Sequence, residues 1–295
     1  MTTQSNPSTG LRRSTFAFKP SDAAPDWLTC TATTKGLGEP LWALGDALLV
    51  EDQTKGEQPT RWQMKGYRGW STLGCRIGVR SDGVLLSLSG LKCRENSQKA
   101  LATSEHCSRL DLAVDVHSAL EMTSVPQNLY RYLNHVPPRN GRPVKRTLIT
   151  NSDGGATLYI GSRTSDWFTR IYDKGIEQKA APPGHWLRFE LEIKGRAADG
   201  VAAALQRAAS VQHFSLSVVA RRLQLVAGIV MYHKYDSVMY HEPPRATSID
   251  RKLRWLSVTV RPTVQVLVEE LGVRKVAHAL GLPQSALRDH EEPLK

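Results

Sequence analysis

The sequence predicts an α+β fold in which a curved antiparallel sheet carries the functional residues and helices flank that sheet. Short runs of alternating apolar and polar residues, typical of strands, recur between residues 26 and 195. Helical spacing interrupts them near residues 38–53 and 124–134, and it dominates from residue 196 onward. Strands with few interleaved helices, followed by a helical run, favour antiparallel pairing with helices packed on the sheet.

The N-terminal part contains an arm, a strand, a helix and a meander. Residues 1–25 are rich in Ser, Thr, Pro and Ala, and we expect them to form a disordered basic arm. "DWLTCTAT" (26–33) is the first strand, and "GEPLWALGDALLVEDQ" (38–53) is a helix with leucines at helical spacing. Residues 61–89 are predicted to form a β meander, whose Asp-Gly turn at 82–83 is typical of a hairpin.

The same order of elements then recurs. "SRLDLAVDVH" (108–117) is a strand, a helix follows at 124–134, and "VPPRNGRPVKR" (136–146) is a basic loop. A second meander comprises "TLIT", "TLYIGSR", "WFTRIYD" and "HWLRFELEIKG", which ends at residue 195. Two strand–helix units, which start at Trp27 and Arg109, indicate an internal duplication.

We therefore expect a core over residues 26–195 and a mainly helical region over residues 196–295 that packs on it. Near the end, "KVAHALGLPQSALRDH" (275–290) fits a helix-turn-helix, although a helical hairpin that closes the core is favoured.

Charge and cysteine content limit the function classes. Lys plus Arg number 39 and Asp plus Glu 28, so the net charge of +11 favours an anionic partner, either nucleic acid or an acidic membrane surface. Without an apolar run of ~18 residues or a hydrophobic N-terminus, we expect a cytoplasmic protein without a membrane partner. The four cysteines are widely spaced and form no CxxC pair, which predicts small buried side chains instead of a disulfide or zinc framework.

Two strands repeat one arrangement of carboxylates. In "RLDLAVDV", Asp111 and Asp115 share a face, and in "WLRFELEIKG", Arg188, Glu190 and Glu192 share a face. Either strand alone fits a solvated polar face, but both in one sheet favour a functional site. Four carboxylates together are a hard-oxygen ligand set that suits Mg²⁺ or Mn²⁺.

"WFTRIYDKGIEQK" (167–179) holds a tyrosine between cations. If its first half is a strand, Arg170, Tyr172 and Lys174 share a face. A free phenol has a pKa of about 10, and neighbouring positive charge lowers it. Tyr172 is therefore a candidate nucleophile for phosphodiester cleavage, which would leave a phosphotyrosyl–DNA link and a free 3′-hydroxyl. The cations and a metal would neutralise the charge of the transition state.

Further basic and aromatic residues are candidates for DNA contact. Tyr67, between Lys65 and Arg68, is a candidate for stacking on a base. The predicted phosphate contacts are Arg139, Arg142, Lys145, Arg146, Arg163 and Arg188. Charge runs are commonly only solvated faces, so each of these stays a candidate.

"RLDLAVDV", "TLYIGSR…RIYDKGIEQK" and "WLRFELEIKG", in this order and spacing, resemble the replication initiation factor family. That family contains rolling-circle plasmid initiators, filamentous-phage replication proteins and relaxases of integrative elements, and the resemblance covers roughly residues 25–280. It implies nicking and rejoining of one strand at an origin, with a tyrosine nucleophile and Mg²⁺ or Mn²⁺. Carried onto this sequence, the nucleophile is Tyr172 and the acidic residues are Asp111, Asp115, Glu190 and Glu192.

Three alternatives bear on this interpretation. Nickases that bind metal through His-hydrophobic-His are not matched, since no such triplet occurs among the nine histidines. A non-catalytic DNA-binding protein, such as an origin-binding protein or repressor on the same scaffold, is the main alternative. A tyrosine recombinase is disfavoured because its nucleophile lies on a helix near the C-terminus, whereas the last tyrosine here is Tyr240 in a loop-like segment.

Besides origin DNA, single-stranded or as an extruded hairpin, a host helicase and a second copy of the chain are further candidate partners.

Overall fold

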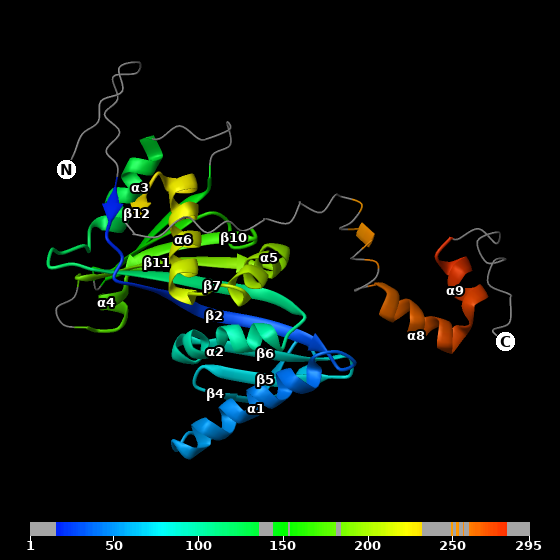
Figure 1. Cartoon of the computed structure of the whole chain (residues 1–295). Coiled ribbons are helices and arrows are strands. Elements are labelled where there is room, and N and C mark those ends of the chain that lie inside the picture. Colours follow the sequence, from blue (N-terminus) through cyan, green and yellow to red (C-terminus); the bar gives the residue numbers. More distant parts are fainter. Residues whose placement is uncertain are drawn as a thin grey trace. The chain divides into compact units, whose positions relative to one another are not determined.

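The computed structural model describes residues 16–135, 144–152, 154–180, 184–231, 249, 252–253, 256 and 260–281 of the chain. The chain divides into two compact units, Met1–Pro243 and Pro244–Lys295. The first unit is built on a ten-stranded sheet in which all neighbouring strands are antiparallel, shown with its helices in Figure 1. This confirms the predicted α+β class with its antiparallel sheet.

The strands and helices have the following bounds. The strands are β1 (Ala17–Phe18), β2 (Asp22–Thr33), β3 (Thr60–Met64), β4 (Tyr67–Thr72), β5 (Cys75–Arg80), β6 (Gly83–Ser89), β7 (His106–His117), β8 (Arg146–Thr150), β9 (Ala156–Ile160), β10 (Trp167–Asp173), β11 (Trp186–Lys194) and β12 (Val230–Met231). The helices are α1 (Gly38–Thr54), α2 (Gly90–Ala102), α3 (Val125–His135), α4 (Lys174–Glu177), α5 (Gly195–Gln206), α6 (Val211–Ala227), α8 (Arg261–Leu271) and α9 (Val273–Ala279).

The sheet consists of two halves with the same topology. Its strand order is β3-β4-β5-β6-β2-β7-β11-β10-β9-β8. In the first half, β2 is followed by α1, by the meander β3–β6, whose last strand pairs with β2, and by α2. In the second half, β7 is followed by α3, by the meander β8–β11, whose last strand pairs with β7, and by a short α4 before β11 and α5 after it. The internal duplication indicated by the sequence is therefore present in the topology.

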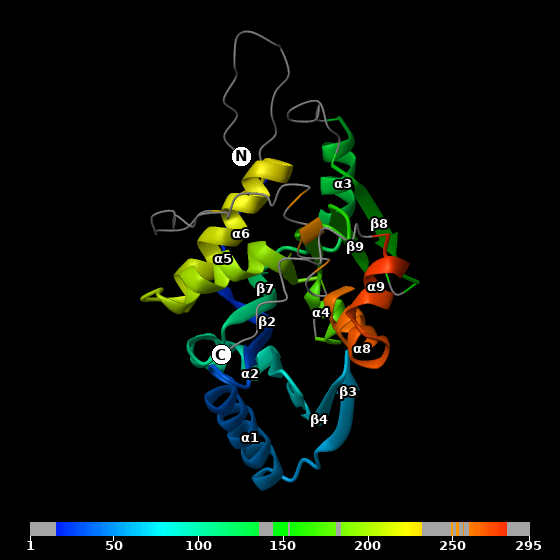
Figure 2. The same cartoon turned by 90° about the vertical axis from the view of Figure 1, so that its right-hand side faces the viewer.

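The halves meet at the centre of the sheet, where β2 pairs with β7. Figure 2 shows the two sheet edges, with β3 and β4 low and β8 and β9 high in the view. Each meander is followed directly by a glycine with φ +56°, Gly90 as the first residue of α2 and Gly195 as the first residue of α5. A positive φ favours glycine, and this backbone conformation turns each strand directly into its helix.

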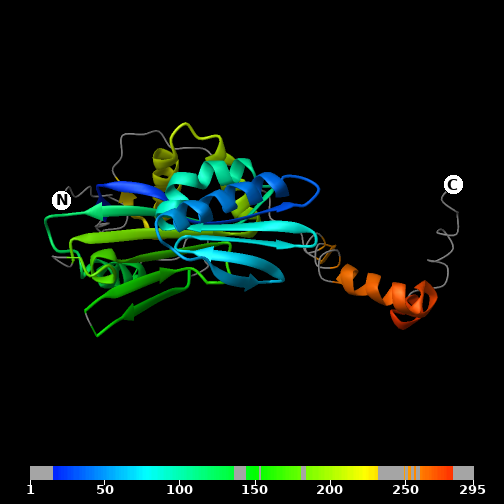
Figure 3. The ribbon, with the colours of Figure 1, turned by 90° about the horizontal axis from the view of Figure 1, so that it is seen from below.

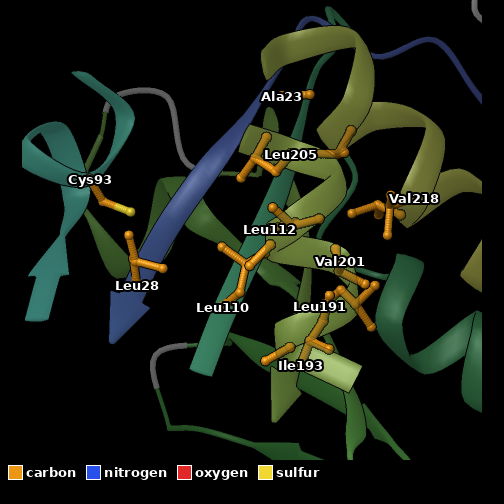
Figure 4. Packing of buried hydrophobic residues seen from close by; sticks show 14 of the residues in the cluster. Ala23, Leu28, Cys93, Leu110, Leu112, Leu191, Ile193, Val201, Leu205 and Val218 are labelled. Carbon is orange, nitrogen blue, oxygen red and sulfur yellow. The ribbon is translucent and has the colours of Figure 1, made fainter. Parts of the chain in front are cut away.

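One face of the sheet packs against helices. Leu110 and Leu112 of β7 and Leu191 of β11 are at most 1% exposed, and they lie beside Val201 of α5 and Val218 of α6 in Figure 4. Figure 3 shows α1, α2, α5 and α6 on the same side of the strands. Burial of one such leucine side chain stabilises the fold by about 1.5–3 kcal/mol, so this face holds the core. The opposite face, which we call the polar face, carries Trp27, Thr29, Ser87, Asp111, Asp115, Arg170, Tyr172, Arg188, Glu190 and Glu192.

The structure differs from the prediction at both ends of the core. Residues 16–25, which we expected in a disordered arm, contain β1 and the start of β2, because Ala23 and Ala24 are buried and Asp22 pairs with Arg94 of α2 at 2.5 Å. Residues 1–15 of that arm lie outside the described residues.

The boundary expected at residues 195/196 falls elsewhere. The units divide at residues 243/244, because α5 and α6 pack on the sheet and belong to the first unit. The second unit contains α8 and α9, and residues 282–290, which would hold the second helix of the predicted hairpin, lie outside the described residues. None of the helices that the structure describes combines the length and apolar character needed to cross a membrane.

Candidate active site

Three neighbouring strands, β7, β11 and β10, bring the predicted site residues onto the polar face. Alternation places every second residue of each strand on this face, and the register aligns them in rows across the sheet. The cross-strand pairs are Asp111 with Glu192, Glu190 with Arg170, Arg188 with Tyr172, and Arg188 with Asp115. Adjacent residues of these rows are within contact distance, so the candidates from three separate motifs form one continuous surface.

Tyr172 is half-buried, and its hydroxyl donates a hydrogen bond to Oε2 of Glu190 over 3.1 Å. The Lys174 Nζ lies 5.8 Å from the centroid of the phenol ring. Burial raises the pKa of Tyr172 well above its ordinary value, and the Glu190 carboxylate adds to this effect, while Arg188 and Arg170 oppose it. The expectation that flanking cations lower this pKa is therefore wrong for this arrangement, since burial and the carboxylate outweigh them.

Glu190 is buried and contacts Nη2 of Arg170 as well as the Tyr172 hydroxyl. Burial raises the pKa of Glu190 to about 7, because the low-dielectric surroundings disfavour its charged form more than Arg170 favours it. Glu190 is thus a hydrogen-bond acceptor that is placed to receive a proton from Tyr172.

Asp111 and Glu192 share one guanidinium. Arg109 donates from Nε and Nη2 to the two oxygens of Asp111 over 2.9 and 2.6 Å, and its Nη2 lies 3.2 Å from Glu192. The Nη2 of Arg170 lies 3.6 Å from Asp111. We call Asp111, Glu190 and Glu192 the carboxylate triad, since its three members are held together by two arginines.

Asp115 is separate from the carboxylate triad. Arg188 donates from Nε and Nη2 to its two oxygens over 2.7 and 2.8 Å, and both side chains are buried. A second contact of Arg188 reaches Asp26 at 3.3 Å, and Arg94 lies 3.6 Å from Asp115. The structure thus brings together three of the four predicted acids, and the predicted DNA contact Arg188 is a buried ion-pair partner.

The fit of a divalent cation depends on donor type and on position. The carboxylate triad offers the hard oxygen donors that Mg²⁺ and Mn²⁺ prefer. Among the residues that the structure describes, however, no group of three or more His, Cys, Asp or Glu side chains is arranged to hold a metal ion. The guanidiniums of Arg109 and Arg170 lie against these oxygens, so the residues fit a cation by chemistry and not by their present positions.

The other predicted DNA contacts fall in different places. Arg139 and Arg142 lie outside the described residues. Lys145 is exposed just before β8, whereas Arg146 donates to a backbone carbonyl of α3. Arg163 is exposed and lies over two aromatic rings of β9 and β10, 5.6 and 5.8 Å from their centroids.

Sequence reasoning missed four residues around the site. Arg109 could have been found, because it shares the face of Asp111 by simple alternation. Trp27 is the cross-strand partner of Asp111, and Asp26 lies at an irregularity in the β2–β7 pairing, between Pro25 and Trp27. Asp26 reaches the site because of that irregularity, and Arg94 reaches it from α2. Neither position follows the alternation of a strand, so the sequence pattern does not reveal them.

Known proteins share both sequence and fold with this chain. A family model described as replication initiation factor matches residues 106–277, which is more than half of the chain. The putative DNA relaxase NicK of Bacillus subtilis (strain 168) is 22% identical over 232 residues, which cover 63% of this chain. The match spans 64% of that relative, so less than two thirds of its length is represented here.

A solved structure has a similar fold. The rolling circle replication initiator protein from Geobacillus stearothermophilus superimposes with a TM-score of 0.54 at 19% sequence identity. The superposition covers 79% of this chain and 91% of that protein. At this identity the likeness concerns the fold alone.

Proposed function

Because the chain belongs to the replication initiation factor family, we propose that it nicks and rejoins one strand of origin DNA through a covalent link to Tyr172. The observation that carries the proposal is the position of this hydroxyl. It lies on the polar face, half-buried, with a carboxylate acceptor 3.1 Å away and cationic side chains on either side. This tyrosine also lies within the matched residues 106–277.

The proposed step transfers a phosphoryl group from DNA to tyrosine. The Tyr172 oxygen attacks phosphorus while its proton passes to Glu190, the acceptor it already contacts. The bond between phosphorus and the 3′ oxygen breaks, and that oxygen receives the proton. The products are a 5′-phosphotyrosyl link and a free 3′-hydroxyl, and because the phosphodiester bond energy is kept, the reverse step rejoins the strand.

Cationic groups near Tyr172 are suited to the charge that develops on the phosphoryl oxygens. Arg170 is 29% exposed in its side chain, so it can face a bound phosphate, whereas Lys174 lies close to the ring, is 13% exposed and is paired with Glu177. Preorganised cations of this kind stabilise a transition state that is more negative than the ground state. Arg188, which is held by Asp115, would act by orienting the tyrosine from its cross-strand position.

A covalent-adduct assay tests the proposal. A labelled single-stranded origin oligonucleotide with Mg²⁺ or Mn²⁺ should give an adduct that survives denaturing electrophoresis. Tyr172→Phe should abolish this adduct and spare DNA binding, because only the hydroxyl is lost. Tyr159→Phe is the matched control, since Tyr159 lies on the neighbouring strand and is paired with Arg170. An unchanged adduct in Tyr172→Phe would reassign the nucleophile.

One observation favours the second candidate function, a non-catalytic DNA-binding protein. The carboxylate triad is neutralised by arginines, as expected of a scaffold in which the acids serve only stability. In that case the wild-type chain would bind the oligonucleotide and form no adduct at any divalent-ion concentration.

The divalent cation is a proposal of its own, in which the carboxylate triad holds the ion in place of the arginines. When bound, a cation would supply charge neutralisation at the phosphate. Arg109→Gln should bind Mn²⁺ about tenfold more tightly than the wild type, because a competing positive charge is removed. Asp111→Asn should bind it more weakly. The affinity of the wild type and of each variant for Mn²⁺ is measured by calorimetric titration without DNA. Undetectable binding in the wild type and in both variants would contradict a cation at this site.

A further inference from the structure

The first half of the sheet repeats the frame of the candidate site without its acids. Both meanders end at a glycine that begins a helix, Gly90 and Gly195, so positions can be matched by counting back from them. Three residues before each glycine stand Ser87 in β6 and Glu192 in β11. The cross-strand partner of Glu192 is Asp111, whereas that of Ser87 is Thr29.

The other site positions follow the same register. Five residues before the glycines, Leu85 stands where the second half has Glu190. Gly78 stands at the position of Arg170, and Arg80 stands at the position of Tyr172. The members of the carboxylate triad are thus replaced by a hydroxyl pair and a leucine. An anion approaching the polar face here meets no carboxylate at these matched positions.

Arg76 of β5 is a cation that has no acidic partner among the residues that the structure describes. It is half-buried on the polar face and pairs across the strands with Ser87. Within the described ranges, no carboxylate lies within ion-pair distance of its guanidinium, which lies 5.5 Å from the centroid of the Trp27 ring. A guanidinium that is held against an aromatic ring and lacks a counter-ion is well placed for a phosphate.

Aromatic rings accompany this cation. Trp27 is half-buried, and the guanidiniums of Arg76 and Arg109 lie 5.5 and 4.8 Å from its ring centroid. Trp62 of β3 is half-buried and lies over Gly78, where an added Cβ would meet its ring at 3.0 Å. Glycine at position 78 therefore lets this ring lie close to the sheet. We call Trp27, Trp62 and Arg76 the aromatic strip.

Tyr67, the stacking candidate from the sequence, is placed differently. It is only 7% exposed, and the guanidinium of Arg80 lies 4.6 Å from its ring centroid. Arg80 is itself paired with Asp82 at 2.5 Å. Tyr67 is therefore covered and does not offer its ring to a base, so stacking falls to the two tryptophans.

The aromatic strip is continuous with the candidate active site. Trp27 is the cross-strand partner of Asp111, and Arg109 contacts both the Trp27 ring and the carboxylate triad. Five strand spacings separate β5, which carries Arg76, from β10, which carries Tyr172. At about 4.8 Å per spacing this is roughly 24 Å along the sheet.

We propose that the aromatic strip binds single-stranded DNA and leads it across the sheet to Tyr172, an inference that rests on the proposed nicking function. A single strand fits because its bases have free π-faces that stack on tryptophan, whereas a duplex has none to offer along its length. The cation and the neutral hydroxyls match a phosphate backbone. Phosphate contacts of this kind position a strand without reading its sequence.

Binding of a labelled oligothymidine of about 16 nucleotides to the full chain, followed by fluorescence anisotropy, tests the strip. Trp27→Leu and Trp62→Leu should each weaken binding about five- to 150-fold, the loss of one stacked base. Arg76→Gln should reduce the slope of log K against log salt by about 0.7, the loss of one phosphate contact on a single strand. Trp70→Leu is the matched control, because Trp70 is 43% exposed and lies on β4 with its side chain on the opposite face.

Circular dichroism spectra that match the wild type establish that each variant is folded. An unchanged Kd in Trp27→Leu and Trp62→Leu, or an equal loss in Trp70→Leu, overturns the inference. An equal loss of duplex binding in the strip variants also overturns it, since stacking would then not be involved. The assay needs no cleavage, so the nicking proposal fails separately, through absence of the wild-type adduct.

Discussion

Asp115 and Arg188 show how the polar face accommodates buried charge. Two hydrogen bonds of 2.7 and 2.8 Å join them, and each side chain is at most 6% exposed. A buried ion pair contributes little net stability compared with an apolar pair, but loss of one partner leaves the other charge unpaired. The pair therefore fixes the position of Arg188, which faces Tyr172 on the next strand.

Asp115→Asn should destabilise the fold by about 3–5 kcal/mol, because the buried Arg188 guanidinium loses its bidentate counter-charge and keeps only the contact with Asp26 at 3.3 Å. The free energy of unfolding is measured by urea titration followed by circular dichroism. Asp82→Asn is the control, since its partner Arg80 is exposed and such surface pairs contribute about 0–1 kcal/mol. Similar losses in the two variants would show that Asp115 is not held in a buried pair.

Asp115 also makes the stability of the fold depend on pH. Burial raises the pKa of Asp115, but the hydrogen bonds and charge of Arg188 outweigh burial and hold it below the ordinary value, which is about 3.9. Between the two values the unfolded chain binds a proton and the folded chain does not, so stability falls as the pH falls. Asp115 contributes its full stabilisation at any pH above its pKa in the unfolded chain. This stabilisation is lost as the pH falls through the lower pKa that Asp115 has in the folded chain.

The free energy of unfolding of the wild type should therefore drop more steeply below about pH 4 than that of Asp115→Asn. Asp111 and Glu190 contribute with the opposite sign, since burial raises the pKa of each, but they are common to both proteins and cancel in the difference. Urea titrations at about pH 5 and pH 3 provide the measurement. Parallel losses in the two proteins would mean that the pKa of Asp115 is not lowered.

For single residues, alternation along a strand is the informative signal in the sequence. It predicts that Asp111, Glu190 and Glu192 lie on one face, and the structure brings these three together. It cannot give the pKa of Tyr172, because that depends on burial and on a partner from another strand. The cations next to Tyr172 in sequence affect its pKa less than burial and the Glu190 carboxylate, which comes from the neighbouring strand.

Among the elements, α1 depends on one close approach to the sheet. Gly45 of α1 lies over Ile77 of β5, and a Cβ at position 45 would come 2.2 Å from Cδ1 of Ile77. A glycine within a helix costs up to about 1 kcal/mol in propensity compared with alanine. Its use here is therefore explained by packing.

Gly45→Ala should lower the free energy of unfolding by about 1–3 kcal/mol, because overpacking outweighs the gain in helix propensity. Ile77→Val removes the methyl group that clashes, so the double variant should recover part of the loss. Thermal or urea unfolding of the two single variants and the double variant gives the coupling between positions 45 and 77. Strictly additive effects would contradict the close approach.

The sequence predicts most elements and misses α2 for a physical reason. The helix Gly90–Ala102 buries Cys93, Asn96, Ser97, Ala100 and Leu101, of which two are polar. Its buried stripe is therefore barely hydrophobic, and a search for apolar spacing does not detect it. The helical spacing expected from residue 196 onward also does not show where α6 ends, which is at Gly228, a residue in a left-handed conformation with φ +63°.

For the whole molecule, the two proposals assign DNA binding to the first half of the duplicated sheet and DNA cleavage to the second half. Both halves use the same order of strands and helices, and both start their last helix at a glycine with φ +56°. The second half concentrates carboxylates and the tyrosine, whereas the first half has hydroxyls, tryptophans and Arg76 at the corresponding face. Because the two halves share one sheet but differ in charge, one half can bind a DNA strand while the other half cleaves it.

The unit boundary predicts how shortened chains behave. A chain that ends at residue 243 contains the first compact unit, with α5 and α6 on the sheet. It should unfold in one cooperative thermal transition.

A chain that ends at residue 195 lacks both helices and exposes Leu112, Leu191 and Ile193, each at most 1% exposed in the full chain. Exposure of such side chains costs about 1.5–3 kcal/mol each, which is a large share of the 5–15 kcal/mol that stabilises a typical domain. The shorter chain should therefore bind the dye ANS and aggregate in size-exclusion chromatography. Cooperative unfolding of the 1–195 chain would show that the sheet does not need α5 and α6, and that the boundary expected from the sequence is a real one.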